Sequence, residues 1–101
     1  MKVHWTDTAR FQLRQIYHHI SLHSEKYARH VVDRITRRSQ QMGEFSMSGR
    51  KVPEIGLDQV REVIEGKYRI IYRVKPRQID ILAVIHGARE ILVDDEQNEP
   101  Q

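Results

Sequence analysis

The sequence contains no cysteine, which excludes disulfide bonds, thiolate nucleophiles and cysteine-based metal sites. It also lacks any run close to the roughly 18 apolar residues that a membrane-spanning helix requires. No apolar leader segment follows Met1, because the chain continues directly into charged sequence. We therefore expect a cytoplasmic protein with no membrane partner, whose stability comes from packing.

Apolar residues make up 39% of the 101 residues, which is enough for one modest hydrophobic core. Two cores of about 50 residues each would be marginally stable, so we predict a single domain over residues 1–93. The remaining segment, residues 94–101, is acidic and has no aliphatic or aromatic side chain. That composition predicts a disordered tail.

The formal net charge of +3 hides an uneven distribution. Residues 90–101 carry five acidic and no basic residues, whereas residues 1–89 carry 17 basic and nine acidic residues, a net charge of +8. A basic body attracts acidic partners at long range, so it indicates binding to nucleic acid or to a protein that handles or mimics nucleic acid. A basic surface that is only solvated remains the alternative.

Apolar residues at helical spacing predict an antiparallel pair of helices. The first helix should start at the capping sequence Thr6-Asp7-Thr8 and run to about Leu22. The chain then turns at His23, and Ser24 caps a second helix that should end at Gly43.

Alternating apolar and polar residues predict four β-strands, at residues 2–5, 60–64, 68–74 and 79–86. The last strand is apolar on both faces, so we expect it inside the sheet, with Ile79, Ile81, Ala83 and Ile85 sharing one face. Arg69 and Arg73 share a face of the preceding strand, which we expect to point outward or into a cleft. The pattern leaves open which later strand pairs with the first.

The element order β-α-α-β-β-β predicts an α+β fold in which the helical hairpin packs on one face of a small, mainly antiparallel sheet. Between the hairpin and the last three strands, residues 43–58 have no periodicity and are punctuated by glycine and proline. This predicts a long loop, and loops of this length in compact domains are often functional.

Six short segments, in order along the chain, carry a family resemblance. They are Trp5-Thr6-Asp7-Thr8-Ala9, Gly49-Arg50-Lys51-Val52-Pro53-Glu54, Val60-Arg61-Glu62-Val63, Tyr68-Arg69-Ile70-Ile71-Tyr72-Arg73-Val74, Ile79-Asp80-Ile81-Leu82-Ala83-Val84 and His86-Gly87-Ala88-Arg89. In order, spacing and residue type together they closely resemble the RelE/ParE superfamily of toxins from type II toxin–antitoxin modules, over about residues 2–92. The resemblance implies a bacterial or archaeal growth-inhibiting toxin with the same β-α-α-β-β-β fold, held inactive by an antitoxin encoded beside it.

Two activities occur on this fold, as the resemblance implies. RelE-like members are ribosome-dependent endoribonucleases that cut messenger RNA, whereas ParE-like members poison DNA gyrase and have lost the nuclease residues. The ending His86-Gly87-Ala88-Arg89 looks more like the ParE branch. We therefore favour a gyrase inhibitor that is not itself an enzyme and needs no cofactor. The alternatives are a RelE-like nuclease acting on the ribosome and its mRNA, and a non-toxic member that only binds an antitoxin.

A site that cleaves RNA would need a base for the 2′-hydroxyl proton, cations for the phosphate and an acid for the leaving oxygen. By the resemblance, Glu54, Arg69 and His86 stand near positions where some nucleases of the superfamily keep a Glu, an Arg and a His. The candidates for binding phosphate or a target protein are Arg61, Arg69, Arg73 and Arg89. Most of these residues also have a plainer interpretation. Glu54 could be a solvated loop carboxylate, and Arg69 and Arg73 could protect the sheet surface from aggregation. His86 could form a hydrogen bond to a neighbouring loop, and Arg89 could brace the sheet.

Histidine and aromatic residues raise the questions of a metal site and of base stacking. His19 and His23 have the i, i+4 spacing that can chelate zinc on a helix. No cysteine and no acidic residue joins them on that face, so we predict no bound metal. Trp5, Tyr17 and Tyr27 lie on or beside apolar stripes, and we expect them in the core rather than on a base-stacking surface.

The antitoxin that the resemblance implies should fill an apolar groove along the helical hairpin and the sheet edge, with an amphipathic helix or an added strand. It could be ParD-like or of another class, and the two proteins would form a hetero-oligomer. Arginines on the helices supply positive charge for an acidic antitoxin, unless they are only solvated, and the complex should weaken with salt. The predicted contacts are Arg10, Arg14, Arg34, Arg37 and Arg38.

Overall fold

The computed structural model describes residues 1–87 of the chain. The predictions for Arg89 and for the acidic tail lie outside the described residues. The elements, in chain order, are β1 (Lys2–Trp5), α1 (Asp7–Ser21), α2 (Glu25–Met42), β2 (Arg50–Lys51), β3 (Val60–Glu65), β4 (Tyr68–Val74) and β5 (Gln78–His86). This order confirms the predicted α+β fold and adds one short strand, β2, inside the long loop.

The five strands form one mixed sheet in the order β1-β5-β4-β3-β2. β5 lies between β1 and β4, which confirms its predicted interior position and accounts for its two apolar faces. β1 pairs with β5 in parallel, and all other neighbours are antiparallel. The partner of the first strand, which the sequence pattern left open, is therefore the last strand.

Both predicted helix starts are confirmed by their capping hydrogen bonds. The Thr6 hydroxyl accepts from the Ala9 amide at 3.2 Å, and the Ser24 hydroxyl accepts from the Tyr27 amide at 3.1 Å. Gly43 caps the end of α2, at a position where a Cβ atom would lie 2.5 Å from the carbonyl oxygen of Met1. Glycine therefore lets the end of α2 pack directly against the start of β1.

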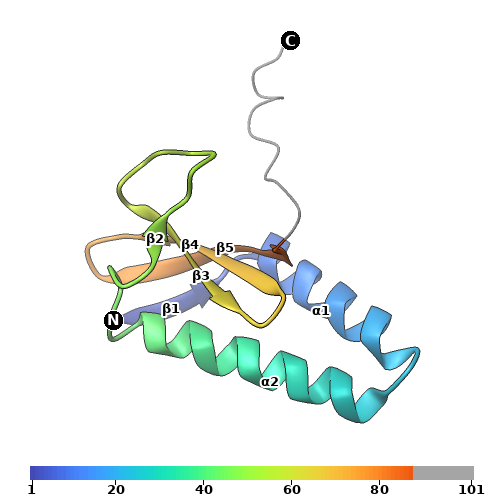
Figure 1. Ribbon diagram of the computed structural model, residues 1–101. Coiled ribbons are helices and arrows are strands. Elements are labelled where there is room, and N and C mark those ends of the chain that lie inside the picture. The colour runs from blue at the N-terminus through green and yellow to red at the C-terminus, as the bar shows by residue number, and fades with distance from the viewer. Residues whose placement is uncertain (88–101) are drawn as a thin grey trace.

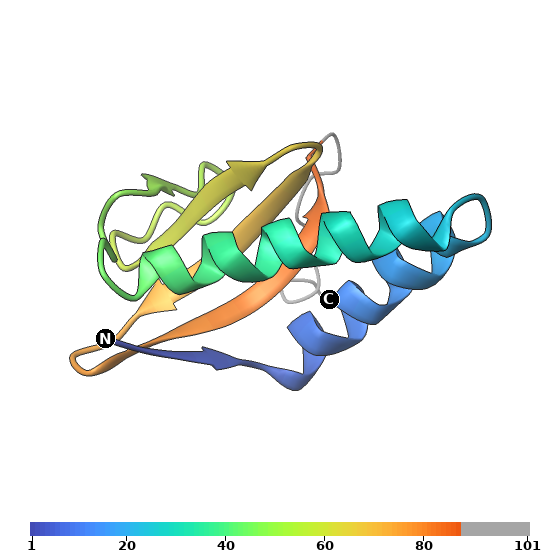
Figure 2. The same ribbon diagram turned by 90° about the horizontal axis from the view of Figure 1, so that it is seen from below.

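The molecule has three layers (Figure 1). Both helices cover one face of the sheet, and the loop that contains β2 covers part of the other face. Seen from the helix side, α2 runs obliquely over the sheet, and the turn between α1 and α2 projects beyond the sheet (Figure 2). The larger core lies under the helices and includes Ala9, Ile35, Met42, Ile70, Tyr72, Ile79 and Ile81. A smaller core under the loop consists of Val52, Val60, Ile71 and Ile85.

An irregularity in the β4–β5 pairing changes the predicted alternation of β5. Ile71 pairs with Ala83 but the next residue, Tyr72, pairs with Ile81, so one residue of β5 is left over as a bulge. Ile81 and Val84 consequently both enter the helix-side core, and Ile85 enters the loop-side core. The prediction that Ala83 and Ile85 share a face with Ile79 and Ile81 was wrong, because a bulge inverts the alternation beyond it.

Candidate functional site

A buried cluster of charged side chains lies under the long loop. Arg69, on β4, donates from Nε to Glu62 at 2.7 Å and from both Nη atoms to Glu54 at 3.0 Å. Arg50 caps the cluster from outside, donating from Nε to the second oxygen of Glu62 at 2.6 Å. We call these four residues, Arg50, Glu54, Glu62 and Arg69, the arginine–carboxylate cluster.

Arg69 was expected to point outward or into a cleft, and its burial excludes the outward orientation, whereas it does line a pocket together with Arg50 and Glu54. Its side chain is only 6% exposed and that of Glu62 is fully buried, because Glu54 and the residues around it fold over this half of the sheet. Hydrogen bonds to Glu54 raise the pKa of Arg69 further, although burial acts in the opposite direction. Arg69 therefore stays cationic, with its charge compensated by two carboxylates.

The loop above the cluster is fastened to the sheet by two further side chains. The Tyr72 hydroxyl donates to the carbonyl of Ser46 at 2.8 Å and accepts from the Gly49 amide at 3.0 Å. Arg61 donates to the carbonyl of Gly49 at 3.0 Å and to the carboxylate of Asp58 at 2.9 Å. Arg61, a predicted phosphate or target contact, thus lies largely against the loop, with its side chain 15% exposed.

Arg73 is more accessible to a partner than Arg61 and Arg69, the other two described candidates for contact with a target. It lies on the same face of β4 as Arg69 and is partly exposed. Within residues 1–87 it forms no salt bridge, and its cross-strand neighbour Asp80 is paired with Lys75 at 2.6 Å. Of the described candidates for contact with a target, Arg73 is the one whose charge remains most available.

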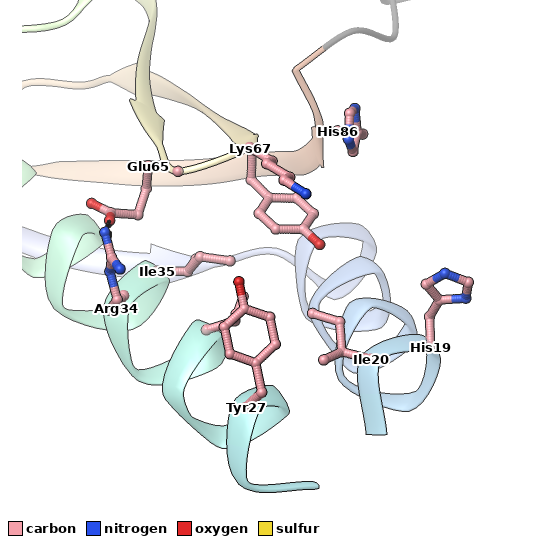
Figure 3. A pocket seen from close by; sticks show the side chains of 11 residues that line it. His19, Ile20, Tyr27, Arg34, Ile35, Glu65, Lys67 and His86 are labelled. Atoms are coloured by element: carbon pink, nitrogen blue, oxygen red, sulfur yellow. Dashed lines mark hydrogen bonds and ion pairs between the residues drawn. The ribbon is translucent and has the colours of Figure 1, made fainter. Parts of the chain in front are cut away.

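A pocket lies at the other side of the sheet, between the helical hairpin and the turn that joins β3 to β4 (Figure 3). Its volume is about 450 Å³. Ile20, Val31 and Ile35 contribute its apolar wall, and Tyr27, Lys67 and His86 lie around it. We call this the hairpin pocket.

The sequence analysis did not identify the hairpin pocket, mainly because it assigned Tyr27 to the core. We expected Tyr27 in the core, but its exposed fraction is 56%. Tyr68 lines the pocket and packs its ring edge-on against His86 with 5.9 Å between ring centroids. Burial raises the pKa of Tyr68 and the nearby Tyr27 raises it further, so the Tyr68 hydroxyl stays protonated at neutral pH. Helical spacing predicts which face of a helix a residue lies on. It does not predict whether that part of the helix packs against the sheet or projects past it.

The three nuclease candidates are not brought together. Glu54 and Arg69 form an ion pair on the loop side of the sheet. His86 pairs across the strands with Tyr68 and lines the hairpin pocket on the helix side. The bulge in β5 causes this separation, because an unbroken alternation from Asp80 would place His86 on the face of Arg69.

The helix arginines predicted to contact an antitoxin have different surroundings. Arg10 pairs with Asp7 at 2.6 Å and Arg34 pairs with Glu65 at 2.9 Å. Arg38 is partly buried and donates to Gln41 at 3.1 Å. The two that are exposed and form no salt bridge within the described part of the chain are Arg14 and Arg37.

The sequence model of the protein family described as "ParE toxin of type II toxin-antitoxin system, parDE" matches residues 3–91. The chain belongs to this ParE toxin family. A solved structure of the chromosomal ParDE toxin–antitoxin system from P. aeruginosa is similar to this ParE-family toxin. The two chains share 26% sequence identity over 85% of this chain and 95% of the other, with a TM-score of 0.71. No curated protein matches the sequence.

Family membership confirms the predicted ParE branch and the toxin role in a type II toxin–antitoxin system, and the similar ParDE structure supports an antitoxin as partner. None of the helices in residues 1–87 is long and apolar enough to cross a membrane. Over the same residues, no group of three or more histidine or acidic side chains is arranged to hold a metal ion.

Proposed function

We propose that this ParE-family toxin inhibits DNA gyrase rather than cleaving RNA. The observation that carries the proposal is the buried pairing of Arg69 with Glu54 and Glu62. A phosphate-binding arginine must offer its donors to the phosphate, and here all three guanidinium nitrogens of Arg69 donate to carboxylates. Releasing them would leave two carboxylates without their buried counter-ion, at a cost of several kcal/mol.

The placement of the remaining nuclease candidates supports the same proposal. General acid–base cleavage needs its base, its acid and its phosphate-binding cations around one scissile bond. Glu54 is occupied by Arg69, and His86 lines the hairpin pocket on the opposite face of the sheet. The toxin then acts by binding a protein target, without a reaction or cofactor of its own.

The loop-side face of the sheet is the surface that we assign to the target. Of the candidate arginines within the described residues, Arg73 is the one whose charge is available on this face. Arg89, outside the described residues, would extend the contact. Arg61 and Arg69 would shape this face by holding the loop, as their contacts with Asp58, Glu54 and Glu62 suggest. Gyrase itself handles an acidic polymer, which suits a basic body of +8 over residues 1–89.

Neutralisation by a ParD-like antitoxin in the cytoplasm completes the proposed function. The antitoxin would cover the helical hairpin, where Arg14 and Arg37 are exposed and Arg10, Arg34 and Arg38 lie nearby on the same two helices. An acidic amphipathic segment is the chemistry that fits such a surface.

Two parallel assays with the purified full-length chain test the proposal. We expect inhibition of gyrase supercoiling with accumulation of cleaved DNA, and no cleavage of mRNA on translating ribosomes. Arg73→Ala should weaken gyrase inhibition about tenfold, while Arg77→Ala, an exposed arginine on the β4–β5 turn, should leave it within about twofold. Cleavage of ribosome-bound mRNA without an effect on gyrase would refute the proposal. Inactivity in both assays would favour the non-toxic alternative.

A further inference from the structure

We infer that a second pocket, on the loop side of the sheet, anchors the target protein by taking an aliphatic side chain that neighbours a carboxylate. This loop-side pocket has a volume of about 380 Å³ and is lined by Arg50, Pro53, Glu54, Ile64, Arg69 and Gly87. The inference rests on the proposed action on a protein target and adds the chemistry of the segment that the target inserts. Arg50 and Ile64, which were not among the predicted site residues, are the contacts that it assigns.

The outer part of the loop-side pocket presents positive charge, although the arginine–carboxylate cluster is neutral as a whole. The side chain of Glu62 is fully buried and that of Glu54 is 21% exposed, whereas that of Arg50 is 65% exposed. Within residues 1–87 Arg50 donates to Glu62 through Nε, at 2.6 Å, which leaves its two Nη atoms to donate to a partner. A carboxylate is the group that matches two parallel guanidinium donors.

Arg50 is held in place before a target binds. The pairing of β2 with β3 puts Arg50 directly opposite Glu62, and their ion pair orients the guanidinium. One residue earlier, Gly49 is bonded to Tyr72 and to Arg61, and a Cβ atom there would lie 2.5 Å from the Tyr72 hydroxyl. Binding would therefore order little that is not already ordered, which lowers the entropic cost of the contact.

Apolar surface next to Arg50 suits an aliphatic side chain from a protein. Ile64 leaves 50% of its surface exposed on β3, and Pro53 is exposed on the loop. An aliphatic group in the pocket would remove this surface from water. A phosphate backbone offers no such group, and the guanidinium of Arg69 already donates to carboxylates. The loop-side pocket therefore fits a protein segment better than a nucleic acid.

Two substitutions test the two halves of the inference, and each has a matched control. Arg50→Gln removes the charge but keeps a side chain that can bond to Glu62, and Lys51→Gln removes the charge of the next residue of β2, which points to the other side of the strand. Ile64→Thr makes the apolar wall polar and keeps a β-branched residue, and Leu22→Thr makes a similar change at a 79% exposed residue between the helices. All four side chains are exposed, so each variant is expected to fold, and its thermal unfolding is recorded first.

We expect Arg50→Gln and Ile64→Thr each to weaken the inhibition of gyrase supercoiling about tenfold, with the controls within about twofold. The same two variants should lose growth inhibition in cells that lack the antitoxin. Arg50→Lys keeps the charge without the paired donors, so its activity should be intermediate. Arg50→Gln should keep its affinity for the cognate antitoxin within about twofold, as measured by calorimetry, because the pocket is assigned to the target.

Three results would overturn the inference. The first is full activity of both pocket variants on gyrase and in cells. The second is loss of antitoxin affinity with toxicity intact, which would assign the pocket to the antitoxin. The third is cleavage of mRNA by the wild-type chain that both variants abolish, which would assign the pocket to a nucleic acid.

Growth inhibition separates this inference from the proposed target. If the wild-type chain poisons cells without acting on gyrase or mRNA, the proposed gyrase target fails alone. The loss of toxicity in Arg50→Gln and Ile64→Thr would then still support the loop-side pocket as the site for another protein. A wild-type chain that does not inhibit growth would refute both.

Discussion

At the scale of single residues, the environment of a charged side chain decides what it can do. Arg69 and Arg73 are four positions apart on one strand and share a face, yet Arg69 is 5% exposed and Arg73 is partly open to solvent. The difference arises because the loop carrying Glu54 covers only one end of that face. Two arginines that are equivalent by sequence pattern therefore have different roles, one in holding the loop and one available to a partner.

Asp80 allows a test of whether its ion pair with Lys75 stabilises the fold. The hydrogen bond from Lys75 lowers the pKa of Asp80 below its ordinary value of 3.8, although burial opposes the shift. The carboxylate therefore stabilises the fold above the unfolded pKa, and this contribution is lost as pH falls through the lower folded pKa. We expect Asp80→Asn to be less stable than wild type in urea unfolding at pH 7, and the difference to shrink below about pH 4.

The control for this experiment is Asp33→Asn, an exposed carboxylate on α2. It should leave the free energy of unfolding within about 0.5 kcal/mol of wild type at both pH values. A wild-type advantage over Asp80→Asn that persists unchanged at pH 3 would contradict the assigned cause.

At the scale of elements, β3, β4 and the long loop form one unit through the arginine–carboxylate cluster. β2 pairs with β3 through only two residue pairs, Arg50 with Glu62 and Lys51 with Arg61. The ladder alone is too short to hold a loop of this length, so much of the attachment comes from side-chain bonds of Glu62 to Arg50, of Arg69 to Glu54 and of Tyr72 to Gly49. Periodicity could not predict β2, because two residues do not make a pattern.

Removing Glu62 tests this unit. Glu62→Ala leaves the buried guanidinium of Arg69 with Glu54 as its remaining cluster partner, so we expect a loss of about 3 kcal/mol in urea unfolding. The control Glu25→Ala removes an exposed ion pair with Arg29, 3.6 Å long, and should cost less than about 1 kcal/mol. Equal losses in the two variants would show that the cluster does not stabilise the protein.

At the scale of the whole molecule, the charge distribution sets how the toxin meets its partners. Residues 1–89 carry a net charge of +8, and the exposed Arg14 and Arg37 extend it over the helical hairpin. Attraction between exposed charges is screened at distances beyond about 10 Å at 0.1 M salt. Electrostatic attraction should therefore contribute more to antitoxin binding at low salt.

We expect calorimetry to show an antitoxin affinity about tenfold weaker at ~0.5 M than at ~0.05 M NaCl. The double variant Arg14→Gln with Arg37→Gln should reduce this salt dependence. The matched double variant Lys2→Gln with Arg77→Gln also removes two positive charges, but from β1 and the β4–β5 turn. It should leave the salt dependence closer to that of the wild type. An affinity that does not change with salt would refute the electrostatic contribution.

The sequence by itself determined every described element except β2, and their order. Thr6 and Ser24 cap their helices through bonds to residues three positions later, and strand alternation depends on neighbours two positions apart. Such interactions are local, so they can be read along the chain. The family resemblance rested on the same ordered segments and was confirmed over residues 3–91.

Only the tertiary structure decided what the candidate site residues can do. One bulge in β5 turned His86 away from Arg69, and the folding of the loop buried Arg69 between Glu54 and Glu62. The projection of the hairpin past the sheet left Tyr27 beside a pocket instead of in the core. Each outcome depends on contacts between residues far apart in sequence, and the periodicity of a single segment carries no information about them.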